Sequence, residues 1–287
     1  VKMLFNMIRR QLQLPRARNR FLAHLNHVMN EYKAINFESL SPKEIIAYYQ
    51  RFETTLLLEW KAPLINDFFA MIWSGMLQKQ TEKYAPHTPN IHNDLLCGSQ
   101  DIISVEPIHR SIAIARLVQE NESAKELFES EVAGVIWQVL LNGEFPEIKV
   151  AIDEYIDRFG ERCVGELKLE TISYAQAPER FVKIIKSYVE QGVIQKKTHS
   201  NIENELRKNA EQEVFNQLKN KPLKRWWFKF ALRQARDLVS NRENLRYERT
   251  RGFGMVRRMF SALGKHLPNL VHPRDFFYLE LAEIKNI

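Results

Sequence analysis

The feature that most constrains the fold is the spacing of apolar residues, which recur every three or four positions along most of the chain. Apolar residues at this spacing line one face of an α-helix. Alternation with period two, which indicates half-buried strands, is almost absent, and the glycines and prolines fall between the periodic segments. The sequence therefore predicts an all-α fold, an irregular multi-helix domain, with a short extended segment at 277–279 near the C-terminus.

The same spacing, together with end signals, sets the helices that we expect. They cover residues 15–32, 42–60, 64–84, 105–121, 123–130, 132–142, 145–159, 178–191, 200–219 and 222–267. Ser41-Pro42-Lys43-Glu44 is a capping box with proline at the first helical position. Pro63 should kink or end the helix that this box opens, and Gly160 should be a C-cap.

The length of 287 residues suffices for one large domain or two small ones. Residues 85–104 form the longest break in helical spacing. We expect a single helical domain over 1–287 that divides at most into sub-lobes 1–84 and 105–287, joined by loop 85–104.

Composition narrows the class of protein. Apolar residues make up 45% and charged residues 27%, which is typical of a soluble globular protein. No apolar run approaches the roughly 20 residues of a membrane span, and the charged first residues do not resemble a signal peptide. Cys97 and Cys163 form no CxxC pair and fit a reducing compartment. We expect a cytoplasmic protein without a membrane partner.

Positive charge is concentrated in one stretch of the chain. Between Lys224 and Arg258 there are eleven Lys and Arg residues but only three acids, Asp237, Glu243 and Glu248. This local excess is larger than the net charge of +7 of the whole chain. A basic patch of this kind favours an anionic partner: a phosphate, a nucleotide, nucleic acid or the acidic face of another domain.

Helical steps from Leu238 pass through Arg242, Arg249 and Gly252, so two arginines interrupt an apolar stripe. An arginine on such a stripe costs free energy unless it is paired or meets an anion, and a glycine there permits close backbone approach. One interpretation is a substrate-binding cluster of Arg242, Arg246, Arg249 and Arg251 that faces an anionic ligand or domain.

A structural interpretation of the same arginines is favoured by the residues alone. Ser240 to Glu243 forms another capping box, so the helix would break at Ser240 and its phase would reset. Arginine also extends its guanidinium to water along an apolar stem. Glu243 or Glu248 would otherwise pair with these arginines inside the chain.

Three other features have two interpretations each. Asp67, flanked by large apolar residues, lies in a buried hydrogen-bond network or in a pocket, and the network is favoured. Arg162 and Glu166, four residues apart, either brace their loop as an ion pair or present Arg162 to a neighbouring domain as a docking site. The aromatic residues of "RWWFKF" (225–230) lie among cations as in single-strand nucleic-acid sites, but Trp227, Phe230 and Ala231 fit a core-facing stripe, which is the expected role.

No catalytic or metal site is expected in this chain. His24 and His27 are three residues apart with no acidic residue between them, which does not suit a zinc pair on a helix. No Ser/His/Asp or Cys/His arrangement indicates a nucleophile, and no glycine-rich phosphate-binding loop is present.

Several stretches together resemble the phosphoenolpyruvate-utilising phosphotransferases, a family that includes phosphoenolpyruvate synthase and rifampicin phosphotransferase. They are "RENLRYERTRGFGMVRRMFSALGKHL", "HPRDFFYLELAEI", "YIDRFGERCVGELKLETISYAQAPERF", "INDFFAMIWSGML" and "LLCGSQDIISVEP". The resemblance covers residues 20–284. Glu161 stands where the family commonly has histidine, and Lys168 occupies the acidic position of the same loop.

The resemblance implies that this chain is the helical middle region of a larger enzyme. In that family an ATP-grasp domain precedes the region, and a domain with a phosphorylatable histidine in a "T-x-G-G-x-x-C-H" context follows it, a motif that this chain lacks. The implied reaction moves phosphate from ATP, with Mg²⁺, through phosphohistidine to pyruvate or another small acceptor. The chain itself would carry no cofactor, would be inert alone, and would act as scaffold, docking surface and part of the acceptor pocket.

The alternative function is a non-catalytic helical module whose basic patch binds an anionic partner such as nucleic acid. The phosphotransferase function is favoured over this alternative, because the resemblance extends over several separate stretches in the right order. Nucleic acid is therefore the less favoured partner.

Overall fold

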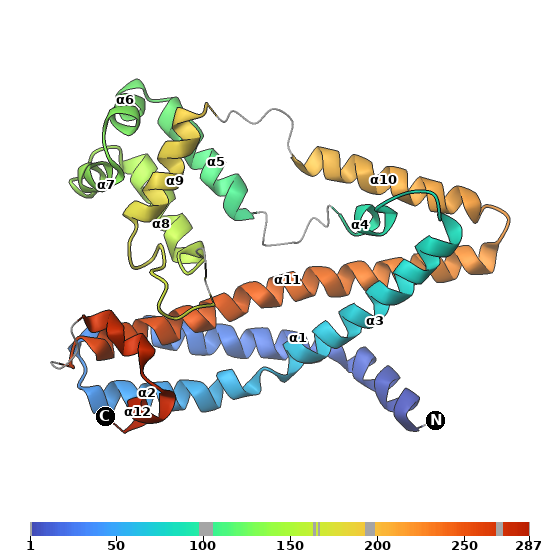
Figure 1. Ribbon diagram of the computed structural model, residues 1–287, viewed down its shortest axis with the longest axis horizontal. Coiled ribbons are helices and arrows are strands. Elements are labelled where there is room, and N and C mark those ends of the chain that lie inside the picture. Colours follow the sequence, from blue (N-terminus) through green and yellow to red (C-terminus); the bar gives the residue numbers. More distant parts are fainter. Residues whose placement is uncertain are drawn as a thin grey trace. The chain divides into compact units, whose positions relative to one another are not determined.

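The computed structural model describes residues 2–97, 106–162, 165, 167–192, 199–267 and 272–286. Over these residues all regular elements are helices, which confirms the all-α fold (Figure 1). The chain divides into two compact units. Unit 1 comprises Val1–Asn26, Leu58–Ile103 and Lys196–Arg246, and unit 2 comprises His27–Leu57, Ser104–Gln195 and Tyr247–Ile287.

Unit 1 is built from helices that are distant in sequence. Its elements are α3 (Lys61–Tyr84), α4 (Ile91–Leu96), α10 (His199–Gln217) and the first parts of α1 (Lys2–Lys33) and α11 (Pro222–Gly264). Helix α4 packs against both α3 and α10. The remaining parts of α1 and α11 belong to unit 2.

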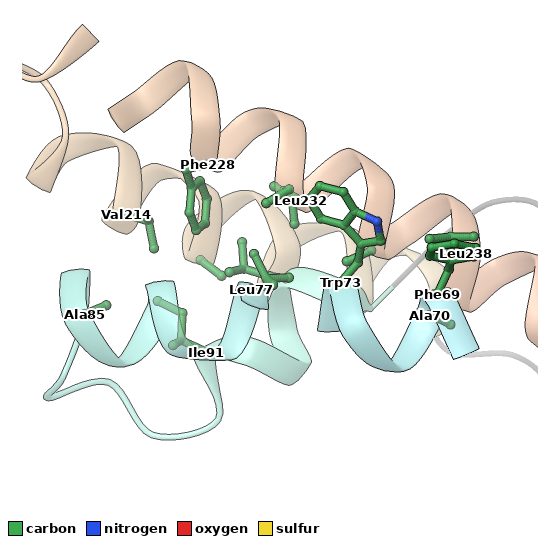
Figure 2. Packing of buried hydrophobic residues seen from close by; sticks show 14 of the residues in the cluster. Phe69, Ala70, Trp73, Leu77, Ala85, Ile91, Val214, Phe228, Leu232 and Leu238 are labelled. Atoms are coloured by element: carbon green, nitrogen blue, oxygen red, sulfur yellow. The ribbon is translucent and has the colours of Figure 1, made fainter. Parts of the chain in front are cut away.

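One apolar core holds unit 1 together. Trp73 and Leu77 of α3 lie against Phe228 and Leu232 of α11, and Val214 of α10 lies beside Phe228 (Figure 2). Leu77, Val214 and Phe228 are completely buried. Burial of a large apolar side chain stabilises the folded state by about 1.5–3 kcal/mol, so these contacts fix the first part of α11 against α3 and α10.

Unit 2 contains the remaining helices. They are η1 (Phe37–Ser39), α2 (Pro42–Thr55), α5 (Glu106–Gln119), α6 (Glu122–Ser130), α7 (Ala133–Leu141), α8 (Pro146–Phe159), α9 (Glu179–Glu190), η3 (Pro273–Tyr278) and α12 (Leu281–Lys285). The short 3₁₀-helix η2 (Leu57–Glu59) begins at the last residue of a unit 2 segment and continues into unit 1. Helix α9 packs against α5, α6 and α7. The rings of Tyr155 in α8 and Phe181 in α9 stack with their centroids 3.8 Å apart.

The expected end signals of two helices are confirmed. The side chain of Ser41 accepts a hydrogen bond from the backbone of Glu44, and the Glu44 side chain accepts one from the backbone of Ser41, so the capping box is complete. Gly160 is the C-cap of α8, in a right-handed conformation.

Other expectations about helix ends are wrong. Helix α1 begins at Lys2 and contains Pro15 in its interior. Helix α2 ends at Thr55, and Pro63 lies in the first turn of α3, where its missing N–H costs no hydrogen bond. Helix α11 runs through Ser240 without a break, so the capping box there does not reset the phase.

Two segments expected to be irregular are partly helical. The described part of 85–104 contains α4, and residues 98–104 lie outside the described ranges. Phe277 and Tyr278 belong to the 3₁₀-helix η3, so the extended segment expected at 277–279 is reduced to the extended backbone of Leu279. No helix in the described ranges is long and apolar enough to cross a membrane.

Candidate functional site

Arg242 and Arg246, the first two arginines of the predicted cluster, lie in unit 1 and are exposed. The Arg242 side chain is 56% exposed, and its Nε atom lies 3.9 Å from Oδ1 of Asp67. Nη1 of Arg246 lies 3.8 Å from Oε2 of Glu243, one turn away on the same helix. Ion pairs between exposed side chains contribute about 0–1 kcal/mol. The charge of Arg242 is therefore accessible to an anion from solution.

Arg249 and Arg251, the other two predicted residues, lie in unit 2 and are less exposed. Nη1 of Arg251 lies 2.6 Å from Oε2 of Glu248, whose side chain is nearly buried. Burial raises the pKa of Glu248, and the charge of Arg251 opposes that rise. The Nε atom of Arg249 is buried and has no hydrogen-bond partner among the residues that the structure describes.

Arg257 is the arginine that sequence reasoning missed. Its side chain is completely buried, and its Nη1 atom donates a hydrogen bond of 2.7 Å to Oε2 of Glu161. Its Nε and Nη2 atoms donate to the backbone carbonyls of Leu169 and Lys168, both at 3.2 Å. Arg257 thus fixes the loop after α8 to the second part of α11.

The glycine that allows this contact is Gly254, not Gly252. A Cβ atom on Gly254 would lie closer than 3.0 Å to the Glu161 side chain, whereas a Cβ atom on Gly252 would have no atom of another described element within 4 Å. Among the described residues, the close approach that a glycine at 252 would permit therefore occurs at Gly254 instead. The signal in the sequence for this position was Glu161, which stands where the resemblance leads one to expect histidine.

The docking pair of Arg162 and Glu166 is only half described. Arg162 is partly buried, and its backbone N–H donates to the carbonyl of Phe159 at 2.8 Å. Glu166 lies outside the described residues. The docking role of both residues remains a prediction.

The network expected around Asp67 is built by its neighbour Asn66. The Asp67 side chain is 52% exposed. Asn66 is completely buried, and its Nδ2 atom donates a hydrogen bond of 3.1 Å to the carbonyl of Leu238. The sequence pattern indicated a polar group inside this part of α3 but assigned it to the wrong residue.

Unit 1 contains a polar cavity of about 490 Å³ next to Asn66. Helices α1, α3 and α11 supply its lining. Five of the lining side chains carry amides: Gln11, Asn66, Gln234, Asn241 and Asn244. Nε2 of Gln11 donates to Oε1 of Gln234 at 3.0 Å, which joins α1 to α11 at the cavity wall.

Two arginines also line this cavity. Arg236 is held in place because its Nε donates to the carbonyl of Leu95 at 2.7 Å and its Nη1 lies 2.6 Å from Oε1 of Glu211. Arg18 of α1 is half-buried. The volume lies within the range of about 300–1,000 Å³ that is typical of small-molecule sites. The cavity is thus large and polar enough for a small ligand.

The aromatic residues at the start of α11 face outward more than expected. Phe228 and Ala231 are completely buried, whereas Trp226, Trp227 and Phe230 are 65%, 39% and 37% exposed. Trp227 and Phe230 nevertheless pack against the buried Trp73, with ring centroids 6.0 and 5.3 Å away, so they lie at the edge of the core. The core-facing role predicted for them is confirmed in part, and that for Ala231 is confirmed. The rings of Trp226 and Phe230 are nearly parallel, with centroids 5.9 Å apart.

Metal-ligating side chains do not gather in the part of the chain that the structure describes, where no three His, Cys, Asp or Glu residues come together. His92 is a partly buried histidine of unit 1. Its Nε2 lies 3.2 Å from Oγ of Ser74, and burial lowers its pKa while the charge of Glu82 opposes that shift.

Comparison with known proteins shows to which family this chain belongs. The model of the rifampicin phosphotransferase fourth domain matches residues 61–243, which include α3, α4, α10 and the Asn66 and Arg236 side of the cavity. Rifampicin phosphotransferase from Streptomyces sviceus is 26% identical over 150 residues. That alignment covers 49% of this chain and 17% of the relative, so the chain matches less than a fifth of that protein's length. This chain therefore belongs to the family of the rifampicin phosphotransferase fourth domain and is a helical region related to phosphoenolpyruvate-utilising phosphotransferases.

Proposed function

We propose that this chain is the helical region of a phosphotransferase that moves phosphate from ATP, through phosphohistidine, to a small acceptor. In this role it acts as a scaffold, as a docking surface for the ATP-grasp and phosphohistidine domains, and as part of the acceptor pocket. ATP and Mg²⁺ bind the ATP-grasp domain, and no cofactor binds this chain. The family match supports the reaction class, and the short share of the relative that is aligned leaves room for those domains.

The observation that carries the acceptor role is the polar cavity of unit 1. It combines a volume of about 490 Å³ with amide and guanidinium groups that donate hydrogen bonds. The relative is a rifampicin phosphotransferase, and its name indicates that rifampicin is its acceptor. For this chain the acceptor is pyruvate, an antibiotic or another small molecule. The family match does not choose among them, because the shape of the pocket rather than the fold decides which acceptor binds.

The predicted arginines contribute to docking in this proposal. Arg242 and Arg246 are exposed cations that stabilise the negative charge of an arriving phosphohistidine. Arg249 and Arg251 belong to the same cluster in sequence, and Arg251 is oriented by Glu248. Arg162 is the corresponding docking residue of the loop after α8, together with Glu166.

Phosphoryl transfer tests the proposal. The whole natural protein that contains this chain should transfer phosphate from ATP to a hydroxyl or enolate acceptor, and the isolated chain should not. Turnover by the isolated chain with ATP and pyruvate would show that the chemistry does not depend on other domains. In the whole protein, Arg242→Gln should lower kcat/KM by about tenfold, since one charged hydrogen bond contributes about 1.5–3 kcal/mol. Arg233→Gln, at an 81% exposed arginine of the same helix, is the control.

A second candidate function is a non-catalytic module that binds nucleic acid. The exposed rings of Trp226 and Phe230, beside Lys224 and Arg225, favour it because stacked bases and phosphates need such groups. A fluorescently labelled single-stranded oligonucleotide distinguishes the two functions. The second candidate requires binding that weakens steeply as salt is raised, whereas the phosphotransferase role requires no such binding.

A further inference from the structure

The start of α11, in unit 1, carries an exposed apolar stripe. Leu223, Trp226 and Phe230 recur every three or four residues and are 83%, 65% and 37% exposed. The rings of Trp226 and Phe230 stack on each other with centroids 5.9 Å apart, so they form one continuous surface. Large apolar side chains that gather at the surface of a protein mark a site of contact with a partner.

Cations surround this stripe without acids to balance them. Residues 219–229 contain no acid and five cations, which are Lys219, Lys221, Lys224, Arg225 and Lys229. None of the five makes an ion pair with a carboxylate of the described residues. Arg225 and Lys229, one helical turn apart, lie 5.2 and 5.4 Å from the centroid of the same Phe215 ring. Like charges at this spacing repel each other, so an acidic partner would stabilise them.

Unit 2 carries an excess of the opposite charge on α6 and around α7. Residues 117–148 contain one cation, Lys125, and seven acids, all exposed, which are Glu120, Glu122, Glu126, Glu129, Glu131, Glu144 and Glu147. None of the seven makes an ion pair with a cation of the described residues. Glu122, Glu126 and Glu129 lie on one face of α6, four and three residues apart, so their charges repel one another.

Helix α7, which packs beside α6 (Figure 1), adds an apolar face to this acidic region. The helix contains no charged residue. Val132 and Val135 are 67% and 42% exposed, and Val139 on the same face is partly buried. Glu131 is the C-cap of α6 and Val132 is the N-cap of α7, so acidic and apolar groups adjoin. Ile136, on the opposite face, is completely buried. A helix that is apolar on both faces is suited to burial on both faces.

The two regions complement each other in charge and in apolar character. A nucleic acid would complement the charge at the start of α11, but Leu223, the most exposed member of the stripe, has no ring on which a base could stack. A protein surface that offers carboxylates beside aliphatic side chains matches both the cations and Leu223. The region formed by α6 and α7 has this chemistry, so the chain itself supplies a suitable surface.

We propose that a second copy of this chain is the partner, and that the basic surface of one copy covers the acidic surface of another. The basic surface is formed by Leu223, Lys224, Trp226, Lys229 and Phe230. The acidic surface is formed by Glu126, Glu129, Glu131, Val132 and Val135. This inference goes beyond the proposed function and does not rest on it, because self-association requires no phosphoryl transfer.

Sedimentation equilibrium of the whole natural protein that contains this chain tests the proposal. At low salt the protein should self-associate, and the association should weaken as salt is raised, because exposed charge pairs are screened. A protein that stays monomeric at low salt at all concentrations would overturn the proposal.

Charge reversal locates the contact. Lys224→Glu combined with Lys229→Glu should raise the dissociation constant about tenfold or more, because like charges would then face each other. Glu126→Lys combined with Glu129→Lys should do the same. An equimolar mixture of the two double variants should regain the association of the unchanged protein, because the reversed surface of each is complementary to the reversed surface of the other. Failure of the mixture to associate would overturn the proposal.

Two matched controls accompany these variants. Lys79→Glu combined with Lys83→Glu makes the same change of charge at two exposed lysines of α3 and should leave the association unchanged. Trp226→Ser removes an exposed ring without changing the charge and should weaken the association about tenfold. Leu58→Ser, at a 64% exposed leucine of unit 1, should have no effect. Equal effects of Trp226→Ser and Leu58→Ser would contradict the assigned surface.

The same samples distinguish the possible partners and functions. A protein that binds a labelled single-stranded oligonucleotide but remains monomeric would overturn the proposal in favour of nucleic acid. A whole protein that associates through these surfaces but transfers no phosphate would support this inference and contradict the phosphotransferase role. Phosphoryl transfer by a monomeric protein would overturn this inference alone.

Discussion

Nη1 of Arg257 lies 2.7 Å from Oε2 of Glu161, and the arginine is completely buried while the Glu161 side chain is 21% exposed. The two residues are far apart in the sequence and join the loop after α8 to α11 within unit 2. Burial raises the pKa of Glu161, and the charge of Arg257 opposes this rise. The direct hydrogen bond between the two side chains positions the pair. The backbone carbonyls of Leu169 and Lys168, which also accept hydrogen bonds from Arg257, hold the guanidinium in place.

Removal of Glu161 should destabilise the protein strongly. Glu161→Ala leaves the buried guanidinium of Arg257 without its counter-charge, which costs about 3–5 kcal/mol. Urea unfolding followed by circular dichroism measures the loss. Lys33→Ala breaks an ion pair with Asp157 in which both side chains are more than half exposed, so its cost should stay below about 1 kcal/mol. Equal losses in the two variants would contradict the prediction.

A double variant separates the ion pair from other contacts. Glu161→Leu combined with Arg257→Met should cost less than the sum of the two single variants, because the double change removes both buried charges together. Additive losses would show that the two side chains act independently.

Two glycines of α11 provide a matched pair for testing close packing. Gly254→Ala would place a Cβ atom against the Glu161 side chain, so we expect a loss of about 1–3 kcal/mol from overpacking. Gly252→Ala meets no such atom of the described residues within 4 Å, and alanine favours a helix interior over glycine by about 1 kcal/mol. The midpoint of urea unfolding should therefore fall for Gly254→Ala and rise for Gly252→Ala. The same sign of change in both variants would contradict the assignment.

The core of unit 1 gives a further prediction. Leu77→Ala removes a completely buried side chain that packs among α3, α10 and α11, and it should cost about 2–5 kcal/mol (Figure 2). Met71→Ala, at a 66% exposed position of the same helix, should change stability by less than about 0.5 kcal/mol. Thermal unfolding of both variants checks the difference, and a mild effect of Leu77→Ala would place it outside the core.

Helix identity could be predicted from the sequence because it depends on local spacing. The capping box at Ser41 and the C-cap at Gly160 are local signals, and both are present in the structure. It was harder to predict which face of each helix points toward the core. Where aromatic residues occur on adjacent positions, as at Trp227 and Phe228, the spacing does not decide which one faces the core, and the structure buries Phe228.

The contacts of the candidate sites could not be predicted, because they join residues that are far apart in the sequence. Arg257 is buried only since the loop after α8 supplies Glu161 and two carbonyls, and no helical pattern carries that information. The cavity likewise combines Arg18, Asn66 and Arg236 from three helices. The sequence left open whether arginines of α11 enter the fold and assigned this role to the cluster from Arg242 to Arg251. In the structure Arg257 is buried and Arg236 is largely buried, and the sequence pattern singled out neither of them.

A pH dependence should follow from His92. Burial lowers its pKa below the ordinary value of 6.5, so the folded state binds this proton less tightly than the unfolded state does. As pH falls below about 6.5, the unfolded state takes up the proton first, and the free energy of unfolding decreases until the lowered folded-state pKa is passed. Urea unfolding at pH 7.5 and 5.5 measures this decrease. His92→Asn should reduce the pH effect, whereas His87→Asn, at an exposed histidine of the same segment, should leave it unchanged. A His92→Asn variant with the full pH effect would show that other groups cause it.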